Sequence, residues 1–353
     1  MATPLTGLAC LCRPGFEPEL AAELMHRSAE QGLHGYVRAD TGSGLVQWLG
    51  TGDTDSLAVS AALPFSGLVF VRQKCALIAR LQDLDPADRI GPILAALPDR
   101  KWGEVRVEHP DGDATRPLAA LARSLGNALR PALRKAGRMP ARDDTRRPRL
   151  HVVLLGGTDL LLCEARTDDS SPWPMGIPRL RLPAGAPSRS AAKLEEALLT
   201  FLDEAQRERW LVPGQQAADL GAAPGGWSWV LARHHLRVHA VDNGPMAASA
   251  MDTGVIEHHR ADGFRWQPPK PLDWLVCDMV EQPIRVADRM ATWLANGWCR
   301  HAIFNLKLPM KKRWEETVRC LEHVRENAGP LKQLAARQLY HDREEITVFA
   351  SRG

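Results

Sequence analysis

The sequence predicts an α/β domain in the second half of the chain, preceded by an α+β region. Three observations indicate this fold class. From residue 191 onward, short apolar segments alternate with helical segments, the order typical of a parallel sheet. The first 80 residues follow the order strand, helix, strand, strand. Between the two parts, residues 170–190 contain five prolines, which disfavour both helix and strand.

Bulk composition is that of a soluble globular protein with two domains, or three small ones. The 353 residues are 44% hydrophobic and 25% charged, with a net charge of +3. No apolar run approaches the ~20 residues of a membrane span, and Met1 to Leu8 do not resemble a signal peptide. Seven cysteines without a C-x-x-C motif indicate a reducing compartment, so we expect a cytoplasmic protein without membrane contact.

Residues 1–80 predict a ferredoxin-like N-terminal subdomain. A strand is expected over Leu8–Cys12 and a helix over Glu17–Gln31, where Leu20, Ala21, Leu24 and Met25 recur at helical spacing. Two short strands between residues 35 and 49 surround a glycine-rich turn, and a further strand is expected over Ser66–Ala79.

Residues 81–169 predict a second small subdomain. We expect helices over Asp88–Leu97 and Thr115–Ala136 and strands over Glu104–Glu108, Leu150–Leu155 and Leu160–Ala165. This order, with a basic helix before a final hairpin, is similar to that of a THUMP domain, an RNA-binding module.

Positive charge is concentrated between residues 115 and 149. This stretch contains nine Arg and one Lys against two Asp, although the whole chain is nearly neutral. Such a local excess attracts phosphates; the alternative is a solvated arginine-rich surface. The arginines expected to contact RNA are Arg123, Arg130, Arg134, Arg138, Arg146 and Arg147.

The proline-rich residues 170–190 are expected to form a packed linker, because Trp173, Met175 and Ile177 lie among the prolines. A helix is expected from Ala191 to about Gln206, capped by Ser188 or Ser190. Its buried stripe, Leu194, Leu198, Phe201 and Leu202, leaves Lys193 on a different face.

A glycine-rich turn marks the centre of the predicted α/β domain, residues 191–353. Ala217-Ala-Asp-Leu-Gly-Ala-Ala-Pro-Gly-Gly-Trp227 reads as a strand, a tight turn and the start of a helix. The spacing G-x-x-x-G-G differs from the dinucleotide pattern G-x-G-x-x-G. The next strand ends at Asp242, placed to accept bonds from ribose hydroxyls. This arrangement resembles the S-adenosylmethionine (SAM) site of a Rossmann-like methyltransferase; the alternative is an ordinary strand–turn–helix joint.

Longer sequence motifs extend the resemblance over nearly the whole chain. The chain resembles the 23S ribosomal RNA ribose 2′-O-methyltransferase M family, within the FtsJ-like class. One departure is Ala223, where the family can carry Cys; a backbone contact would survive this change. The motifs are Arg13-Pro-Gly-Phe16, Met175-Gly-Ile-Pro-Arg179, Ala186-Pro-Ser-Arg-Ser-Ala-Ala-Lys-Leu-Glu-Glu196, Val241-Asp-Asn-Gly-Pro-Met246, Val276-Cys-Asp-Met279, Asn305-Leu-Lys-Leu-Pro-Met-Lys-Lys312 and Leu339-Tyr-His-Asp-Arg-Glu-Glu345.

The resemblance implies SAM-dependent 2′-O-methylation of a ribose, in a cytidine of 23S ribosomal RNA. We expect a monomer, although the sequence does not reveal the oligomeric state. Naked RNA and a large-subunit assembly intermediate both remain possible substrates. The implied catalytic set is Lys193, Asp278, Lys307 and Glu345, with Lys307 as general base and Glu344 as an alternative to Glu345. The implied SAM-binding residues are Ser188, Ala223, Pro224, Gly225, Gly226, Asp242, Asp262 and Asp278.

Other activities are marked by motifs that this sequence lacks. Asp278 is not followed by the Pro-Pro-Tyr of base amino methylation, and no Pro-Cys marks a cytosine C5 nucleophile. A small-molecule O-methyltransferase, a methyltransferase for another RNA and a non-catalytic RNA-binding assembly factor remain as alternatives. No cluster of His and Cys at ligand spacing indicates a structural metal.

Overall fold

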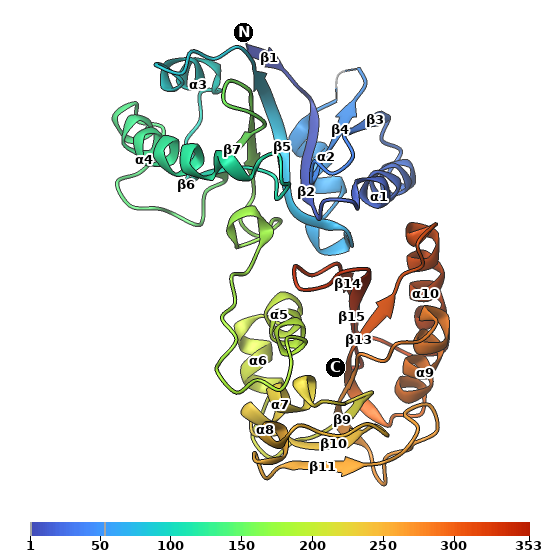
Figure 1. Ribbon diagram of the computed structural model, residues 1–353. Coiled ribbons are helices and arrows are strands. Elements are labelled where there is room, and N and C mark those ends of the chain that lie inside the picture. Colours follow the sequence, from blue (N-terminus) through green and yellow to red (C-terminus); the bar gives the residue numbers. More distant parts are fainter. Residues whose placement is uncertain (1, 53) are drawn as a thin grey trace. The chain divides into compact units, whose positions relative to one another are not determined.

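The computed structural model describes residues 2–52 and 54–353, which form two compact units, Met1–Pro178 and Arg179–Gly353 (Figure 1). The division between them falls inside the proline-rich segment 170–190. Each unit has its own sheet and its own hydrophobic core. Within the described residues, none of the helices combines the length and apolar character needed to cross a bilayer.

The N-terminal unit is built on one eight-stranded sheet in the order β3-β4-β2-β5-β8-β7-β6, with β1 paired to β5. Its long central strand β5 pairs with β2 through Val71–Ala76 and with β8 through Ala76–Leu81. The subdomains expected on either side of residue 80 therefore share a continuous sheet. The strands are β1 (Ala2–Pro4), β2 (Gly7–Cys12), β3 (Gly35–Ala39), β4 (Leu45–Gly50), β5 (Val71–Leu81), β6 (Glu104–Glu108), β7 (Arg149–Leu154) and β8 (Leu160–Ala165).

The structure differs from the expected elements of this unit, first in helix α2 (Ser56–Ala62), which was not predicted. The expected strand from Ser66 begins only at Val71, because a 3-10 turn occupies Phe65–Gly67. The expected helix from Thr115 begins with a 3-10 turn, Arg116–Leu118, which contains Pro117. The α-helices are α1 (Glu17–Glu30), α2 (Ser56–Ala62), α3 (Ile90–Ala96) and α4 (Ala119–Lys135).

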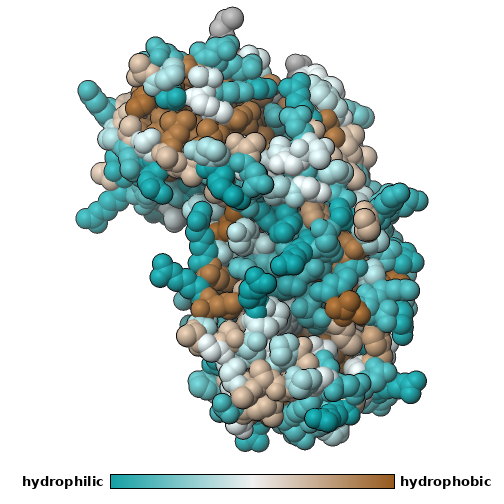
Figure 2. Space-filling view, viewed as in Figure 1, coloured by the Kyte–Doolittle hydropathy of each residue, from teal (hydrophilic) through white to brown (hydrophobic). Residues whose placement is uncertain are grey.

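Helix α4 packs through a stripe of Ala122, Leu125, Leu129 and Leu133 into a core shared with α3 and strands β5 to β8. Part of this core is only half-covered, including Ile90 and Leu94 of α3. Figure 2 shows hydrophobic residues reaching the surface in the region between α3 and β7. The arginines of α4 lie on its other faces, as its amphipathic pattern requires.

The first part of the proline-rich segment packs against the N-terminal unit. Its backbone is held by buried polar side chains: Gln73 exchanges two hydrogen bonds with the backbone of Ser171, and Glu108 accepts a 2.7 Å bond from the Met175 N–H. The side chains of Met175 and Ile177 are buried in the core on that side of the sheet. Burial of these apolar residues fixes the segment.

The C-terminal unit has a seven-stranded sheet in the order β11-β10-β9-β12-β13-β15-β14. The five strands β9 to β13 are parallel to one another, and β15 is antiparallel to both β13 and β14. This topology confirms the predicted Rossmann-like α/β class. The strands are β9 (Gln216–Leu220), β10 (Arg237–Val241), β11 (Ile256–His259), β12 (Leu272–Cys277), β13 (Cys299–Lys307), β14 (Gln333–Arg337) and β15 (Glu345–Ser351).

Helices cover both faces of this sheet (Figure 1). The helix expected over 191–206 is instead two helices, because Asp203 and Gln206 form a capping box that starts a new helix. The helices of one layer are α5 (Ala191–Phe201), α6 (Glu204–Trp210), α7 (Gly226–Arg233) and α8 (Ala248–Met251). Those of the other are α9 (Pro283–Ala295) and α10 (Arg313–Asn327).

A buried acid ties the first strand of this unit to its helix. Asp219, in β9, is 1% exposed and accepts a 2.6 Å hydrogen bond from the Ser228 hydroxyl of α7. Burial raises the pKa of Asp219 to about 7, although the Ser228 bond opposes this change. The folded protein therefore holds a proton on Asp219 at pH values where the unfolded chain has lost it.

We predict that Asp219→Asn changes the pH dependence of stability. Between about pH 4 and pH 7 the folded wild type binds more protons than the unfolded chain, so its free energy of unfolding falls as pH rises. One extra bound proton lowers the free energy of unfolding by up to about 1.4 kcal/mol per pH unit. The Asp219→Asn variant cannot bind this proton, so its free energy of unfolding should lack this decrease. Urea unfolding at several pH values measures the difference, with the exposed Asp252→Asn as control. Parallel profiles for wild type and Asp219→Asn would contradict this account.

Candidate active site

The candidate site lies at the carboxyl edge of the parallel strands. Strands β10, β12 and β13 end at or directly before Asp242, Asp278 and Lys307, and Asp262 follows β11 by three residues. Carboxyl ends of parallel strands meet at one sheet edge, which is where ligands bind in open α/β folds. The structure thus gathers at this edge polar residues that are up to 65 positions apart in the sequence.

Two lysines and two carboxylates form an alternating cluster at this edge. Lys307 Nζ lies 2.6 Å from Asp278 Oδ1 and 3.8 Å from Glu345 Oε1. Lys193 Nζ, which comes from α5, contacts Glu345 Oε1 and lies 3.6 Å from Asp278 Oδ2. The four side chains are between 8% and 24% exposed, so water screens their charges only partly.

Antiparallel pairing selects one of the two adjacent acids at the start of β15. Lys307 and Glu345 are register partners between β13 and β15, which places Glu345 beside the lysines. Glu345 is buried. Glu344 points away into solvent and pairs with Arg313. The geometry therefore favours Glu345 over Glu344 as the fourth member of the cluster.

The cluster keeps Lys193 in its charged form. Burial by itself lowers the pKa of this ammonium, but Asp278, a hydrogen bond to Glu345 and more distant Asp342 raise it above its ordinary value. Lys193 is thus a fixed positive charge between two carboxylates. Lys193 therefore offsets part of the negative charge of these two carboxylates, which also contact Lys307.

A second layer of polar side chains, which the sequence did not reveal, orients Asp278. Buried Asn305 donates a 2.9 Å hydrogen bond to Asp278 Oδ1 through its amide nitrogen. Its amide oxygen lies 2.7 Å from the hydroxyl of buried Thr347 on β15. That hydroxyl also lies 3.0 and 3.2 Å from the two carboxyl oxygens of Asp342.

The single proton of the Thr347 hydroxyl defines the direction of this chain of hydrogen bonds. If the hydroxyl donates to Asn305, the Asp342 carboxyl must be the donor to Thr347, which requires it to be protonated. Burial raises the pKa of Asp342 well above its ordinary value, which favours that form. In sequence, Asn305 and Thr347 are unremarkable strand residues, so only the strand register could identify them.

Glu196 of α5 fixes the loop that leads into β15. This carboxylate is 2% exposed and accepts hydrogen bonds from the backbone N–H groups of Tyr340 and His341, at 2.7 and 3.0 Å. It also contacts the His341 imidazole at 2.7 Å. Because Glu196 lies one turn from Lys193, the same helix positions both the lysine and the loop before Glu345.

The glycine-rich turn from Gly221 to Gly226 is shaped by close contacts as well as by backbone conformation. Gly225 has φ 109°, in the left-handed region, and is the N-cap of α7. A Cβ on Gly226 would lie 2.3 Å from the Ser188 hydroxyl and 2.6 Å from that of Ser190. Side chains at either glycine would displace the turn or the segment that passes beside it.

The serines expected to cap α5 make different contacts. Ser190, the N-cap residue, forms no capping bond, and its hydroxyl lies 2.6 Å from that of Ser188. The Trp227 indole donates a 3.0 Å bond to the Ser190 carbonyl. This bond attaches the 188–190 segment to the glycine-rich turn and places Ser188 beside Gly226.

The acids at the ends of β10 and β11 fit a ribose-bearing ligand. Asp242 accepts backbone hydrogen bonds from Ala223 at 3.1 Å and Gly244 at 2.7 Å, one on each carboxylate oxygen. Each oxygen keeps a second lone pair that could accept a ribose hydroxyl. Asp262 accepts a 2.8 Å bond from the Phe264 N–H and is about half exposed. These residues, with the turn, would hold SAM.

The six arginines expected to bind RNA fall into two groups of three in the N-terminal unit. Arg123, Arg146 and Arg147 are exposed, and the last two pair with Asp144. The guanidinium groups of the other three donate hydrogen bonds to backbone carbonyls of the same unit. The acceptors are Val105 for Arg130, Pro140 for Arg134 and Pro98 for Arg138. Buried Arg149 pairs with Glu104. The basic stretch is therefore less available to phosphates than its charge count indicates.

Family models match three segments that together cover most of the chain. Residues 5–75 match the RlmM ferredoxin-like domain. Residues 88–163 match the N-terminal domain of ribosomal RNA large subunit methyltransferase M, and residues 186–310 match the FtsJ-like methyltransferase domain. The ferredoxin-like and FtsJ-like predictions are confirmed, whereas similarity of the second segment to THUMP domains stays a prediction.

Curated relatives match over almost their full length. Ribosomal RNA large subunit methyltransferase M of Stenotrophomonas maltophilia (strain R551-3) is 58% identical over 346 residues, 98% of this chain and 97% of its own. The proteins of the same name from Xanthomonas oryzae pv. oryzae (strain MAFF 311018) and Xanthomonas campestris pv. campestris (strain B100) are 57% identical over 350 residues, 99% of this chain and 100% of theirs. The chain therefore belongs to the ribosomal RNA large subunit methyltransferase M family.

Proposed function

We propose that this enzyme methylates the 2′-hydroxyl of a ribose, in a cytidine of 23S ribosomal RNA, with Lys307 as general base. The relatives are named as methyltransferases of large-subunit ribosomal RNA, and SAM is the cofactor of the FtsJ-like class. The cofactor supplies a methyl group on a sulfonium centre. The observation that carries the proposal is the alternation of Lys193, Glu345, Asp278 and Lys307 within hydrogen-bond and ion-pair distance.

A ribose hydroxyl is a weak acid, so its reaction requires a base held close to it. In the neutral form, the amine of Lys307 takes the hydroxyl proton and becomes an ammonium. Asp278, 2.6 Å away, and Glu345, 3.8 Å away, stabilise that ammonium. The positive charge of Lys193 lies between the same two carboxylates and offsets part of their negative charge.

The basic N-terminal unit supplies electrostatic attraction for RNA in this proposal. Phosphate contacts from exposed Arg123, Arg146 and Arg147 position the substrate without reading its sequence. The substrate is 23S ribosomal RNA or a large-subunit assembly intermediate, and the enzyme acts as a cytoplasmic monomer. The seven cysteines are all free and buried, in keeping with a reducing compartment.

The direct test of this function is to locate the transferred methyl group in the RNA product. The full chain would be incubated with labelled SAM and 23S ribosomal RNA that lacks its ribose methylation, and the product hydrolysed with alkali. A 2′-O-methyl group blocks cleavage at its own phosphate, so we expect label in an alkali-resistant dinucleotide that contains cytidine. Label released in a mononucleotide would mean base methylation and would exclude the proposed role of Lys307.

In the same assay, Lys307→Ala should reduce single-turnover methyl transfer by at least about 10²-fold, the usual contribution of general-base catalysis. SAM affinity, measured by calorimetry, should change little, because the SAM-binding residues are unaltered. Lys332→Ala, on an exposed residue of the same unit, is the control and should keep the wild-type rate. A Lys307→Ala enzyme within tenfold of wild type would remove Lys307 from the mechanism.

Thr347→Val tests whether the second layer of polar side chains affects catalysis as well as the stability of the fold. The variant keeps the side-chain shape but leaves the Asn305 oxygen and the Asp342 carboxyl without their shared partner, at a cost of about 1–3 kcal/mol in the free energy of unfolding. We also expect a lower kcat with unchanged SAM affinity, since Asn305 no longer fixes Asp278. Thr317→Val, at a buried threonine of helix α10, is the matched control and should keep kcat. Equal kcat values for the two variants would show that the layer is only structural.

The two groups of arginines should differ in their effect on RNA binding. Replacing Arg123, Arg146 and Arg147 together by Gln should weaken binding and reduce the slope of log affinity against log salt by roughly 2, since each phosphate contact contributes about 0.7–0.9. Arg166→Gln, an exposed and ion-paired arginine of the same unit, should leave the slope unchanged. Filter binding across 50–200 mM salt measures both slopes. An unchanged slope in the triple variant would place the RNA elsewhere.

A further inference from the structure

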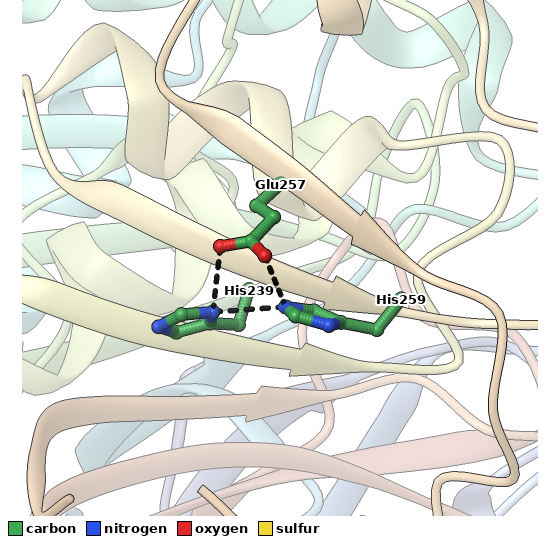
Figure 3. Close-up of side chains that lie close together, drawn as sticks. All are labelled: His239, Glu257 and His259. Carbon is green, nitrogen blue, oxygen red and sulfur yellow. Dashed lines mark hydrogen bonds and ion pairs between the residues drawn. The ribbon is translucent and has the colours of Figure 1, made fainter. Parts of the chain in front are cut away.

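Two histidines and a glutamate meet on one face of the sheet of the C-terminal unit, away from the lysines. His239 of β10 is the register partner of Glu257 on parallel strand β11, and Val241 is the partner of His259. Residues two apart on a strand point to the same face, so Glu257 and His259 lie side by side next to His239. Figure 3 shows the three side chains converging, with the carboxylate above the two imidazoles.

The distances between their donor atoms suit a single metal ion. His239 Nδ1 lies 3.0 Å from His259 Nε2, and the two nitrogens lie 3.5 and 3.6 Å from oxygens of Glu257. Ligands bound to tetrahedral Zn²⁺ at about 2.0–2.2 Å are separated from one another by roughly 3.3–3.6 Å. An ion could therefore enter the triangle with only small side-chain movements.

We propose that His239, Glu257 and His259 form a binding site for a divalent transition-metal ion of the zinc class. Two imidazoles and one carboxylate are a common zinc ligand set, and borderline-soft ions prefer it to oxygen-only sites. Bound water would complete the coordination. This inference does not depend on the proposed methyl-transfer reaction.

The surroundings of this triad allow an ion to enter. Glu257 is 68% exposed at its side chain, and His239 and Glu257 line a surface depression together with Gly254 and Arg237. Burial, with a smaller contribution from His259, lowers the pKa of His239. The positive charge of Lys270 lowers this pKa further, whereas Glu257 raises it. The Trp266 ring covers the imidazoles of His239 and His259 from one side.

An ion at this triad would crosslink the edge strand β11 to β10. His239 lies three residues before Asp242, and His259 lies three residues before Asp262. Both acids belong to the expected SAM-binding set, so the ion would hold together the two strands that present them. The sequence offered no such indication, because the two histidines are 20 residues apart and become neighbours only through the β10–β11 register.

Calorimetric titration of the full, metal-free chain with ZnCl₂ tests the proposal. We expect one ion per chain, and at least a tenfold weaker Kd in each of His239→Ala, His259→Ala and Glu257→Gln. His323→Ala, on a histidine that pairs with Asp288 on α9, is the control and should stay within twofold of wild type. Because all seven cysteines are buried, thiols should not compete for the ion. No binding by wild type, or a triad variant within twofold of it, would overturn the site.

A second readout separates loss of ligands from loss of folding. Glu257→Gln changes an exposed side chain and preserves its shape, so this variant should keep the wild-type Tm without metal. With saturating Zn²⁺, the wild-type Tm should rise while that of Glu257→Gln should not, because ligands that bind only the folded state stabilise it. Co²⁺ should give visible absorption bands with wild type that are lost in the variant. Equal metal-induced shifts in Tm for both proteins would place the ion at another site.

Discussion

Mutual compensation of charge at the sheet edge is the constraint on which the C-terminal unit depends. Removing ammonium and carboxylate groups from water costs several kcal/mol per ion, and an unpaired charge at this depth would be strongly unfavourable. Each of Lys193, Asp278, Lys307 and Glu345 has an oppositely charged neighbour within 4 Å. These residues come from α5, β12, β13 and β15, so all four elements must be correctly placed together.

Asp278 is at the centre of this arrangement and is also the best supported of the four side chains. It faces both lysines and accepts a hydrogen bond from Asn305, which in turn is held by Thr347. Such a satisfied network fixes a side chain more firmly than any one contact could. The glycine-rich turn before α7 is fixed differently, by contacts that exclude any side chain at Gly226.

Polar residues that end an apolar strand could be identified from the sequence. Polar residues within a strand, whose role depends on their neighbours in the sheet, could not. Asp242, Asp278 and Lys307 are polar groups at the ends of apolar strands, so their common edge could be predicted. Lys193 and Glu345 were reached only through the family resemblance. Asn305, Thr347 and the His239 triad depend on strand register, which no local pattern encodes. The break between α5 and α6 was missed because the capping box lies within a continuous amphipathic segment.

The antiparallel insertion of β15 has a consequence for the order of assembly. Lys193 and Glu345 touch although 152 positions separate them, and β15 lies between β13 and β14 in the sheet. During synthesis the N-terminal unit can fold as soon as it emerges, whereas the edge occupied by β15 stays open until that strand is made. The two lysines and Asp278 therefore have no fourth partner until synthesis has reached Glu345. The four-residue cluster is thus completed after the N-terminal unit can already have folded.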